Sequence, residues 1–201
     1  MLSAHGLSCV RGERTLFAQL DLSVDTGEWL HVRGENGSGK TSLLRLLAGL
    51  SPPFEGEVRW CGRSIRQSDS GYMHNRLFFG HNGALKEDLT ALENLSFAAA
   101  IDGAMLAESK ALAALSRFGL KGRAELPVRV LSAGQKRRVM LARLATRNTK
   151  LWVLDEPFTA LDVKAVDLLG SLIAEHLASG GMAVITSHQT VPLPGGRVVQ
   201  L

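Results

Sequence analysis

Residues 34–41 read Gly34-Glu35-Asn36-Gly37-Ser38-Gly39-Lys40-Thr41, and this stretch decides the fold of the chain. It is a complete match to the pattern GxxxxGK[ST]. An apolar run, Trp29 to Val32, precedes it, and leucines at helical spacing follow it up to Leu50. Glycines let the backbone N–H groups of such a loop converge on phosphate, and the following helix directs its positive end toward them. The stretch therefore predicts a phosphate-binding loop between a strand and a helix, rather than a glycine turn that binds nothing.

The side chains of this loop predict a nucleotide polyphosphate with a magnesium ion. In the pattern, the lysine at the position of Lys40 bridges the β and γ phosphates, and the hydroxyl at the position of Thr41 contacts Mg²⁺. Ser42 follows at the start of the predicted helix. The predicted nucleotide-binding residues of this segment are Gly34, Glu35, Asn36, Gly37, Ser38, Gly39, Lys40, Thr41 and Ser42.

A second motif, residues 151–156, is an apolar strand that ends in two carboxylates, Asp155 and Glu156. This is the Walker B arrangement, which holds Mg²⁺ at the phosphates. We expect Asp155 in the shell of the metal together with Thr41. One residue further on, Glu156 is placed to accept a proton from the attacking water or to orient it. Alone, such a pair is usually a solvated turn, but the phosphate loop favours the catalytic interpretation.

The rest of the chain alternates between strand and helix patterns. Short apolar runs before residue 33 predict strands, and residues 84–147 are rich in alanine and leucine, which favours helices. The predicted helices are 91–101, 104–118, 134–147 and 162–177, and the predicted later strands are 151–154, 182–186 and 197–201. Buried strands that flank a helix are typical of a parallel sheet.

Bulk composition excludes several classes of protein. The 201 residues have the size of one domain, and no apolar run approaches the roughly 20 residues that cross a bilayer. The two cysteines, Cys9 and Cys61, lack metal-ligand spacing, so we expect reduced thiols. A net charge of +4 suits nucleic acid, an anionic membrane face, a polyphosphate or simply a solvated surface, and charge alone does not choose among them.

A third motif separates this chain from other phosphate-loop proteins. Residues 131–135 read Leu131-Ser132-Ala133-Gly134-Gln135 and stand at the start of a predicted basic helix, about twenty residues before the Walker B strand. The motif resembles the LSGGQ signature of the ABC ATPase family, with Ala133 in place of a glycine. Taken alone, Ser132 is a plain helix N-cap. In that family the signature of one subunit closes on the γ phosphate held by the other, so the resemblance implies a homodimer with ATP between its subunits.

Two further matches follow at the spacing of the family. Ala160, Leu161 and Asp162 resemble the D-loop, which contacts the partner subunit, and His188 resembles the switch histidine that touches the γ phosphate. The resemblance covers essentially the whole chain. It implies ATP and Mg²⁺ as cofactors, ATP hydrolysis as the activity, and Glu156, His188 and Lys40 as the catalytic residues.

The fold that the resemblance implies is an α/β P-loop NTPase core with a mainly parallel sheet, an N-terminal antiparallel β subdomain and a helical insertion. We expect a single domain, residues 1–201. Its core would span about 1–83 and 148–201, and its helical subdomain about 84–147.

Two positions depart from the family pattern. The aromatic residue that stacks on adenine falls at Arg11, which leaves the base to a guanidinium plane or to nothing. The glutamine that links the magnesium site to the membrane partner falls at His81 in an ungapped count, or at Asn82 after a shift of one residue. We keep both residues as candidates for the Q-loop position.

Several stretches narrow the resemblance to one branch of the family. They resemble the ATP-binding subunit of the bacterial cytochrome c maturation system, often called the haem exporter ATPase. The stretches are Glu13 to Phe17, Gly27 to Trp29, Gly80-His81, Leu89 to Leu95, and Leu154 to Asp162. This implies a peripheral protein on the cytoplasmic face of the bacterial inner membrane, paired with integral membrane permease subunits that dock around residues 81–93. No direct haem binding is expected, because the histidines outside the switch position lack a Cys-x-x-Cys-His setting.

Two other functions remain as alternatives. One is the ATPase of a different small-solute, lipid or drug transporter, which only the narrower resemblance separates from the haem exporter. The other is a soluble ABC-type ATPase that acts on nucleic acid. Translation members of that kind need two ATP modules and DNA-repair members need a long coiled coil, so 201 residues disfavour it, and we expect no nucleic-acid partner.

Overall fold

The computed structural model of the chain describes residues 1–67, 71–80 and 85–201. It divides into two compact units. We call residues 1–81, 149–157 and 173–201 the core unit, and residues 82–148 and 158–172 the helical unit. The phosphate loop and the acidic pair therefore lie in the core unit, whereas residues 131–135 lie in the helical unit. The helical unit also takes in residues 158–172, which lie outside the expected helical subdomain 84–147.

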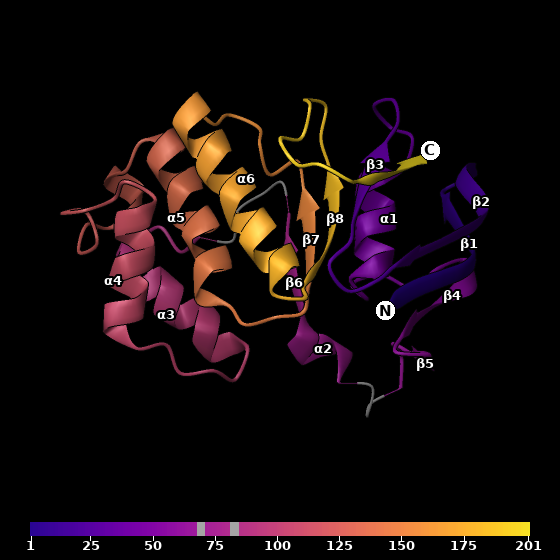
Figure 1. Cartoon of the computed structure of the whole chain (residues 1–201), viewed down its shortest axis with the longest axis horizontal. Coiled ribbons are helices and arrows are strands. Elements are labelled where there is room, and N and C mark those ends of the chain that lie inside the picture. Colours follow the sequence, from indigo (N-terminus) through magenta and orange to yellow (C-terminus); the bar gives the residue numbers. More distant parts are fainter. Residues whose placement is uncertain (68–70, 81–84) are drawn as a thin grey trace. The chain divides into compact units, whose positions relative to one another are not determined.

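An antiparallel sheet of four strands opens the core unit (Figure 1). Its strand order is β2-β1-β4-β5, with β1 Leu2–Arg11, β2 Arg14–Val24, β4 Glu55–Trp60 and β5 Arg63–Ser64. Strands β1 and β2 form a hairpin around Gly12, whose φ of 62° suits the tight turn. The expected N-terminal antiparallel part is confirmed, although β4 and β5 were not among the predicted strands.

A second sheet of the core unit is parallel throughout. Its order is β6-β7-β8-β3-β9, with β6 Arg76–Phe79, β7 Leu151–Asp155, β8 Met182–Thr186, β3 Trp29–Arg33 and β9 Arg197–Gln200. Every residue of β7 and β8 is buried, as their continuous apolar sequences predict. Because the strands are parallel, their carboxyl ends share one edge of the sheet, where the loops that carry function in such sheets lie.

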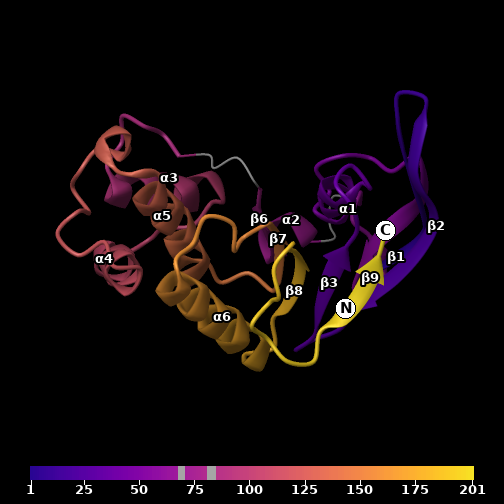
Figure 2. The ribbon, with the colours of Figure 1, turned by 90° about the horizontal axis from the view of Figure 1, so that it is seen from above.

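Helix α1 (Lys40–Leu47) lies between the two sheets (Figures 1 and 2). Its leucines at positions 43, 44, 46 and 47 are buried, and three of them join a core that takes side chains from both sheets. A short helix, α2 (Tyr72–Asn75), precedes β6 and places Tyr72 in the same core. The packing of α1 fixes the loop that leads into it, and this loop is the phosphate-binding stretch.

The helical unit contains α3 (Ala91–Ile101), α4 (Glu108–Arg117), a short 3₁₀ helix (Val128–Val130) and α5 (Ala133–Thr146). Helix α6 (Val163–Ala178) begins in this unit and ends in the core unit. The helices predicted over 91–101 and 134–147 are confirmed, α5 beginning one residue earlier than predicted.

The helix predicted over 104–118 is wrong at its amino end, because α4 begins only at Glu108. The N–H of Gly103 donates to Ala100, and that of Ala104 to Ala99. Gly103 has a φ of 72°. This is the bonding of a Schellman C-cap, so residues 102–104 end α3 instead of starting α4.

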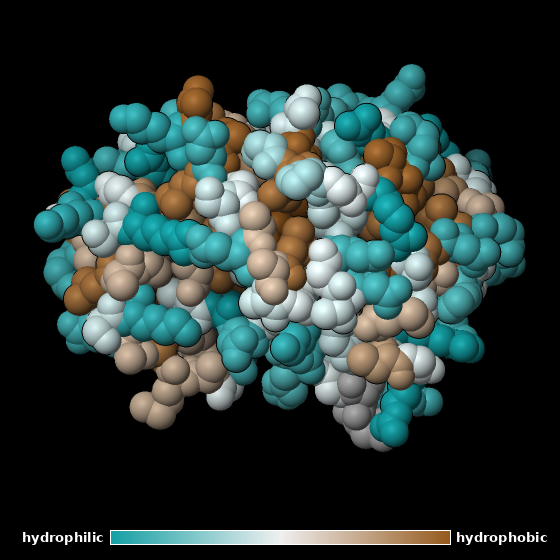
Figure 3. All heavy atoms as spheres, viewed as in Figure 1, coloured by the Kyte–Doolittle hydropathy of each residue, from teal (hydrophilic) through white to brown (hydrophobic). Residues whose placement is uncertain are grey.

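Hydrophilic and apolar side chains alternate over the face drawn in Figure 3. Throughout residues 1–67, 71–80 and 85–201, no helix has both the length and the apolar character that a membrane span requires.

Candidate nucleotide-binding and hydrolysis site

The phosphate loop connects β3 to α1 and keeps the backbone N–H groups of the helix start open. Gly37 and Gly39 have φ values of 83° and 105°, in the left-handed region that suits glycine. Gly39 is the N-cap of α1, and no side chain caps this helix. A Cβ added at Gly39 would also lie 3.1 Å from Leu16 and from Phe17 on β2. The loop therefore needs glycine here both for its conformation and for its close approach to β2.

Two polar side chains of the loop, those of Lys40 and Ser38, differ in their hydrogen bonding. The ammonium of Lys40 donates to the carbonyls of Gly34, at 2.8 Å, and Glu35, at 2.9 Å. The hydroxyl of Ser38 is buried and finds no hydrogen-bond partner among the described residues. A buried polar group without a partner is costly, so the loop favours a ligand that supplies acceptors.

The carboxylate of Asp155 ends β7 and is buried, with 2% of the residue exposed. Its Oδ2 accepts from the hydroxyl of Thr41 at 2.9 Å, and its Oδ1 accepts from the hydroxyl of Thr186 at 2.8 Å. The first bond joins the phosphate loop to the Walker B strand across 114 residues of sequence. The two predicted metal-shell residues, Thr41 and Asp155, are thus in direct contact.

Glu156 follows β7 in an unusual backbone conformation, with a φ of 50° that residues with a Cβ seldom adopt. Its N–H donates to the hydroxyl of Thr186 at 2.9 Å, which fixes the turn after the strand. Its Oε2 accepts from the backbone N–H of His188 at 3.3 Å, and its Oε1 lies 3.5 Å from Nε2 of His188. Strain of this kind is common at active sites, where the surrounding contacts hold it in place.

These groups line one pocket of about 260 Å³ in the core unit. Its wall joins residues of the phosphate loop, the acidic pair, the switch histidine and the first hairpin: Arg11, Leu16, Asn36, Gly37, Gly39, Lys40, Thr41, Ser42, Asp155, Glu156 and His188. Arg11, the residue at the position of the expected base contact, thus forms part of this wall. Sequence reasoning missed Leu16 and Thr186. Thr186 had a signal, since it directly precedes Ser187 and His188 at the end of a predicted strand.

The signature segment lies in the helical unit, where Ser132 is the N-cap of α5. Its hydroxyl accepts from the N–H of Gln135 at 3.3 Å, while the side chain of Gln135 accepts from the N–H of Ser132 at 3.0 Å. This is a capping box. Ser132, Ala133 and Gly134 are exposed, whereas Leu131 is buried. Within one chain the hydroxyl of Ser132 is therefore committed to its own helix.

The D-loop residues also lie in the helical unit, ahead of α6. Ala160 has a φ of 59°, and Asp162 accepts from the N–H of Ala165 at 2.9 Å. This backbone bond lowers the pKa of Asp162, and the nearby guanidinium of Arg138 lowers it further. The Q-loop candidates His81 and Asn82 lie outside the described residues.

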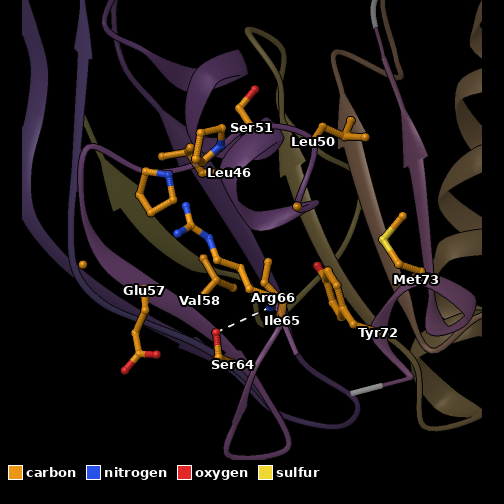
Figure 4. Close-up of a pocket in the computed structure, with 14 residues that line it drawn as sticks. Leu46, Leu50, Ser51, Glu57, Val58, Ser64, Ile65, Arg66, Tyr72 and Met73 are labelled. Carbon is orange, nitrogen blue, oxygen red and sulfur yellow. Dashed lines mark hydrogen bonds between the residues drawn. The ribbon is translucent and has the colours of Figure 1, made fainter. Parts of the chain in front are cut away.

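A larger pocket of about 620 Å³ lies elsewhere in the core unit and shares no residue with the nucleotide pocket (Figure 4). Leu46, Val58, Ile65 and Tyr72 give it an apolar lining, and charged and exposed apolar side chains stand at its border. The hydroxyl of Tyr72 donates to the carbonyl of Leu47, which ties α2 to the end of α1.

Comparison with known proteins agrees with this geometry. The family model described as ABC transporter matches residues 17–159. The chain is 53% identical over 201 residues to the "Cytochrome c biogenesis ATP-binding export protein CcmA" of Dechloromonas aromatica, covering 100% of this chain and 98% of that protein. It is 53% identical over 189 residues to the protein of the same name from Nitrosomonas europaea, covering 94% and 89%.

A solved structure, described as a dimeric ATP-binding cassette in a post-hydrolysis state bound to ADP and Pi, is 27% identical with a TM-score of 0.79. The likeness covers 94% of this chain and 88% of that one. Together, the parallel sheet, the phosphate loop and the acidic pair define a P-loop ATPase that binds nucleotide. The chain belongs to the ABC transporter family as an ATP-binding subunit, and within it to the cytochrome c biogenesis ATP-binding export proteins.

Proposed function

We propose that the chain couples ATP hydrolysis to bacterial cytochrome c maturation, in which haem is exported or a haem-loaded periplasmic chaperone is released. The observation that carries the hydrolytic part is the single pocket shared by the phosphate loop, Asp155, Glu156 and His188. Identity of 53% along the whole chain to a cytochrome c biogenesis export protein supports the specific role. The proposed location is the cytoplasmic face of the inner membrane, beside integral membrane permease subunits.

The phosphate loop would bind the triphosphate of ATP. The open N–H groups at the start of α1 and the ammonium of Lys40 face the pocket and suit phosphate oxygens. On binding, Lys40 would exchange its two loop carbonyls for the β and γ phosphates. Arg11, in the wall of the same pocket, would offer its guanidinium plane to the base.

The residues present fit a magnesium ion. A hydroxyl and a carboxylate, from Thr41 and Asp155, are hard oxygen donors in contact with each other at the phosphate loop. Mg²⁺ takes one or two such protein groups and completes its shell with water and substrate phosphates. When bound, Mg²⁺ would neutralise charge on the phosphates. Thr41 and Asp155 would hold it.

Glu156 is the proposed general base. Because Glu156 lines the nucleotide pocket, its carboxylate can take a proton from water that attacks the γ phosphate. The carboxylate also lies beside the ring of His188. His188 is half-exposed and can turn toward the phosphate while its backbone stays bonded to Glu156. The proposed catalytic set is therefore Glu156, His188 and Lys40.

A homodimer with ATP between its subunits is the proposed active form. Residues 132–134 are exposed at the start of α5, where a phosphate of a second subunit can reach the backbone N–H groups of Ala133 and Gly134. Ala160 to Asp162 would contact the partner as the D-loop. The dimeric cassette bound to ADP and Pi supports this assembly for a chain of the same fold.

The larger pocket is the proposed docking site for the permease. Exposed apolar residues line it, with Leu50 at 41% and Met73 at 58%, and the charged side chains of Glu57 and Arg66 line it as well (Figure 4). This combination suits a short amphipathic segment of a membrane subunit. Met73→Glu should weaken recovery of the permease from membranes. Val198→Glu, at a similarly exposed apolar residue on β9, is the matched control.

The docking region expected from sequence, residues 81–93, is described from residue 85 on, and two of its charged residues pair inside the helical unit. Glu87 pairs with Lys136 at 2.7 Å, and Asp88 pairs with Arg129 at 2.7 Å. Reversing the charge of Glu87 would therefore disturb α5 as well as any partner. The double variant Glu87→Lys with Lys136→Glu keeps the pair, so permease binding by this variant reports on docking alone.

Two measurements test the proposal. Glu156→Gln should retain nucleotide binding and lose turnover by at least about a hundredfold, because a positioned general base contributes that much or more. Wild-type turnover in this variant would remove Glu156 from the mechanism.

Pull-down of the tagged protein from its own membranes should recover cytochrome c maturation subunits. Recovery of an unrelated permease instead would reject the haem assignment and leave the ATPase mechanism intact.

A further inference from the structure

One peptide unit of the core unit, between Ser187 and His188, is held from both sides. Its carbonyl, on Ser187, lies 3.2 Å from Nε2 of His31, and its N–H, on His188, donates to Oε2 of Glu156 at 3.3 Å. A trans peptide is planar, so its carbonyl and N–H point in opposite directions. The direction in which His31 holds the carbonyl therefore also fixes the direction of the N–H toward Glu156.

The hydrogen bonds of His31 determine which ring nitrogen carries the proton. A carbonyl can only accept, so Nε2 must donate to Ser187. On the other side of the ring, Nε of Arg33 donates to Nδ1 at 3.1 Å, which requires a lone pair there. Burial lowers the pKa of His31, against the raising effect of the Ser187 carbonyl. A neutral ring with its proton on Nε2 satisfies both bonds.

The position of His31 in the sheet brings it to this peptide. It is 3% exposed on β3 and is paired in register with Ile185 of β8. Strand β3 runs on into the phosphate loop at Gly34, and β8 runs on into Ser187 and His188. The ring of His31 therefore links the strand that leads into the phosphate loop to the segment that leads into His188, and both contribute to the wall of the nucleotide pocket.

We propose that His31 is a positioning residue for ATP hydrolysis: its Nε2–H fixes the Ser187–His188 peptide, whose N–H in turn holds the carboxylate of Glu156. The inference rests on the proposed role of Glu156 as general base. Without the ring, the carbonyl of Ser187 loses its buried donor and the peptide can rotate. The N–H then leaves Glu156, and its carboxylate samples orientations that do not face the attacking water.

The chain offers a matched control at the opposite end of β8. Nε2 of His176 lies 3.1 Å from the carbonyl of Met182, the first residue of that strand. The ring of His176 also stacks on Trp152, with centroids 3.9 Å apart. Both histidines hold a carbonyl at an end of β8, but within the described part of the chain the hydrogen bond and the ring contact of His176 lie outside the nucleotide pocket.

The experiment compares steady-state ATP hydrolysis and MgATP affinity in four variants. His31→Leu removes the donor and should lower kcat by roughly tenfold, with KM and nucleotide affinity changed by no more than about twofold. His31→Gln places an amide N–H near the position of Nε2 and should restore most of kcat. His176→Leu should lower the melting temperature and leave kcat of the folded protein unchanged. Glu156→Gln should lose turnover.

Three outcomes would overturn the inference. The first is wild-type kcat in folded His31→Leu while Glu156→Gln is inactive. The second is an equal loss of kcat in His31→Leu and His31→Gln. The third is wild-type turnover in Glu156→Gln. The last would also reject the proposed base, whereas the first two leave it standing. If His31→Leu does not fold, the ring ¹⁵N shifts of His31 in the native protein decide. A proton on Nε2 supports the inference, and a proton on Nδ1 rejects it.

Discussion

The start of α1 in the core unit and the start of α5 in the helical unit use their backbone N–H groups in different ways. Gly39 begins α1 without any side-chain cap, so the first-turn N–H groups stay open to the pocket. Ser132 and Gln135 begin α5 with a reciprocal capping box, so the backbone N–H groups of these two residues are already engaged. The first helix start is prepared for phosphate in a single chain. In the proposed dimer, the second would exchange the hydrogen bonds between Ser132 and Gln135 for contacts to a nucleotide.

This difference suits the two helix starts to separate steps of the proposed ATPase cycle. A site that is open in the monomer can bind ATP before any partner arrives. In the proposed dimer, the capped start of α5 would meet phosphate only when the other subunit brings it. We therefore expect that separate substitutions can remove nucleotide binding by the phosphate loop and the proposed closure by residues 131–135.

The largest expected effect is on the open helix start. Lys40→Ala should weaken MgATP binding by about a hundredfold, because charge-assisted bonds to phosphate contribute about 1.5 to 3 kcal/mol each. Its melting temperature without nucleotide should stay within a few degrees, since the ammonium of Lys40 bonds, among the described residues, to two carbonyls of its own loop. Titration with a fluorescent ATP analogue measures the affinity. Unchanged affinity would contradict the role given to this lysine.

A smaller effect is expected at the capped helix start. Ser132→Ala should cost about 1 kcal/mol of unfolding free energy through the lost cap. If Ser132 also serves the nucleotide of a partner subunit, the variant should lose turnover as well. Urea unfolding and ATPase assays at high protein concentration measure the two effects.

The capping box of α3 supplies the matched control, since Thr90 and Glu93 bond as Ser132 and Gln135 do. Thr90→Ala should cost a similar free energy and leave turnover of the folded protein unchanged. Equal turnover in the Thr90 and Ser132 variants would mean that Ser132 acts only as a cap.

The smallest expected effect is on the pH dependence of the stability of the core unit, and it concerns a residue outside both helix starts. Burial lowers the pKa of His176, opposed by the Met182 carbonyl. The unfolded chain, with an ordinary histidine pKa of about 6.5, therefore takes up a proton that the folded chain does not. The contribution of this pKa difference to the free energy of unfolding is complete above the pKa of the unfolded chain. It is lost as the pH falls toward the lower pKa of His176 in the folded chain, by at most about 1.4 kcal/mol per pH unit. His176→Gln should flatten this part of a pH–stability curve.

The elements that sequence predicted well are those with strong local patterns. Strands β7 and β8 are continuous apolar runs, and α3 begins with a capping box, so their bounds follow from neighbouring residues. Strand β4 was missed because glycine and charged residues interrupt its sequence, and β6 because only four residues form it. The predicted start of α4 was too early because the residues just before Glu108, Ala104 to Ala107, have good helix propensity.

Sequence alone determined the motifs of this protein, since the phosphate loop, the acidic pair and the signature depend on the spacing of nearby residues. Only the tertiary structure decided which groups meet. Thr41 reaches Asp155, and His31 reaches the peptide before His188, because the strand order places β8 between β7 and β3. Hydrogen bonds between distant segments depend on which strands are neighbours and in what register. Local spacing carries no record of either.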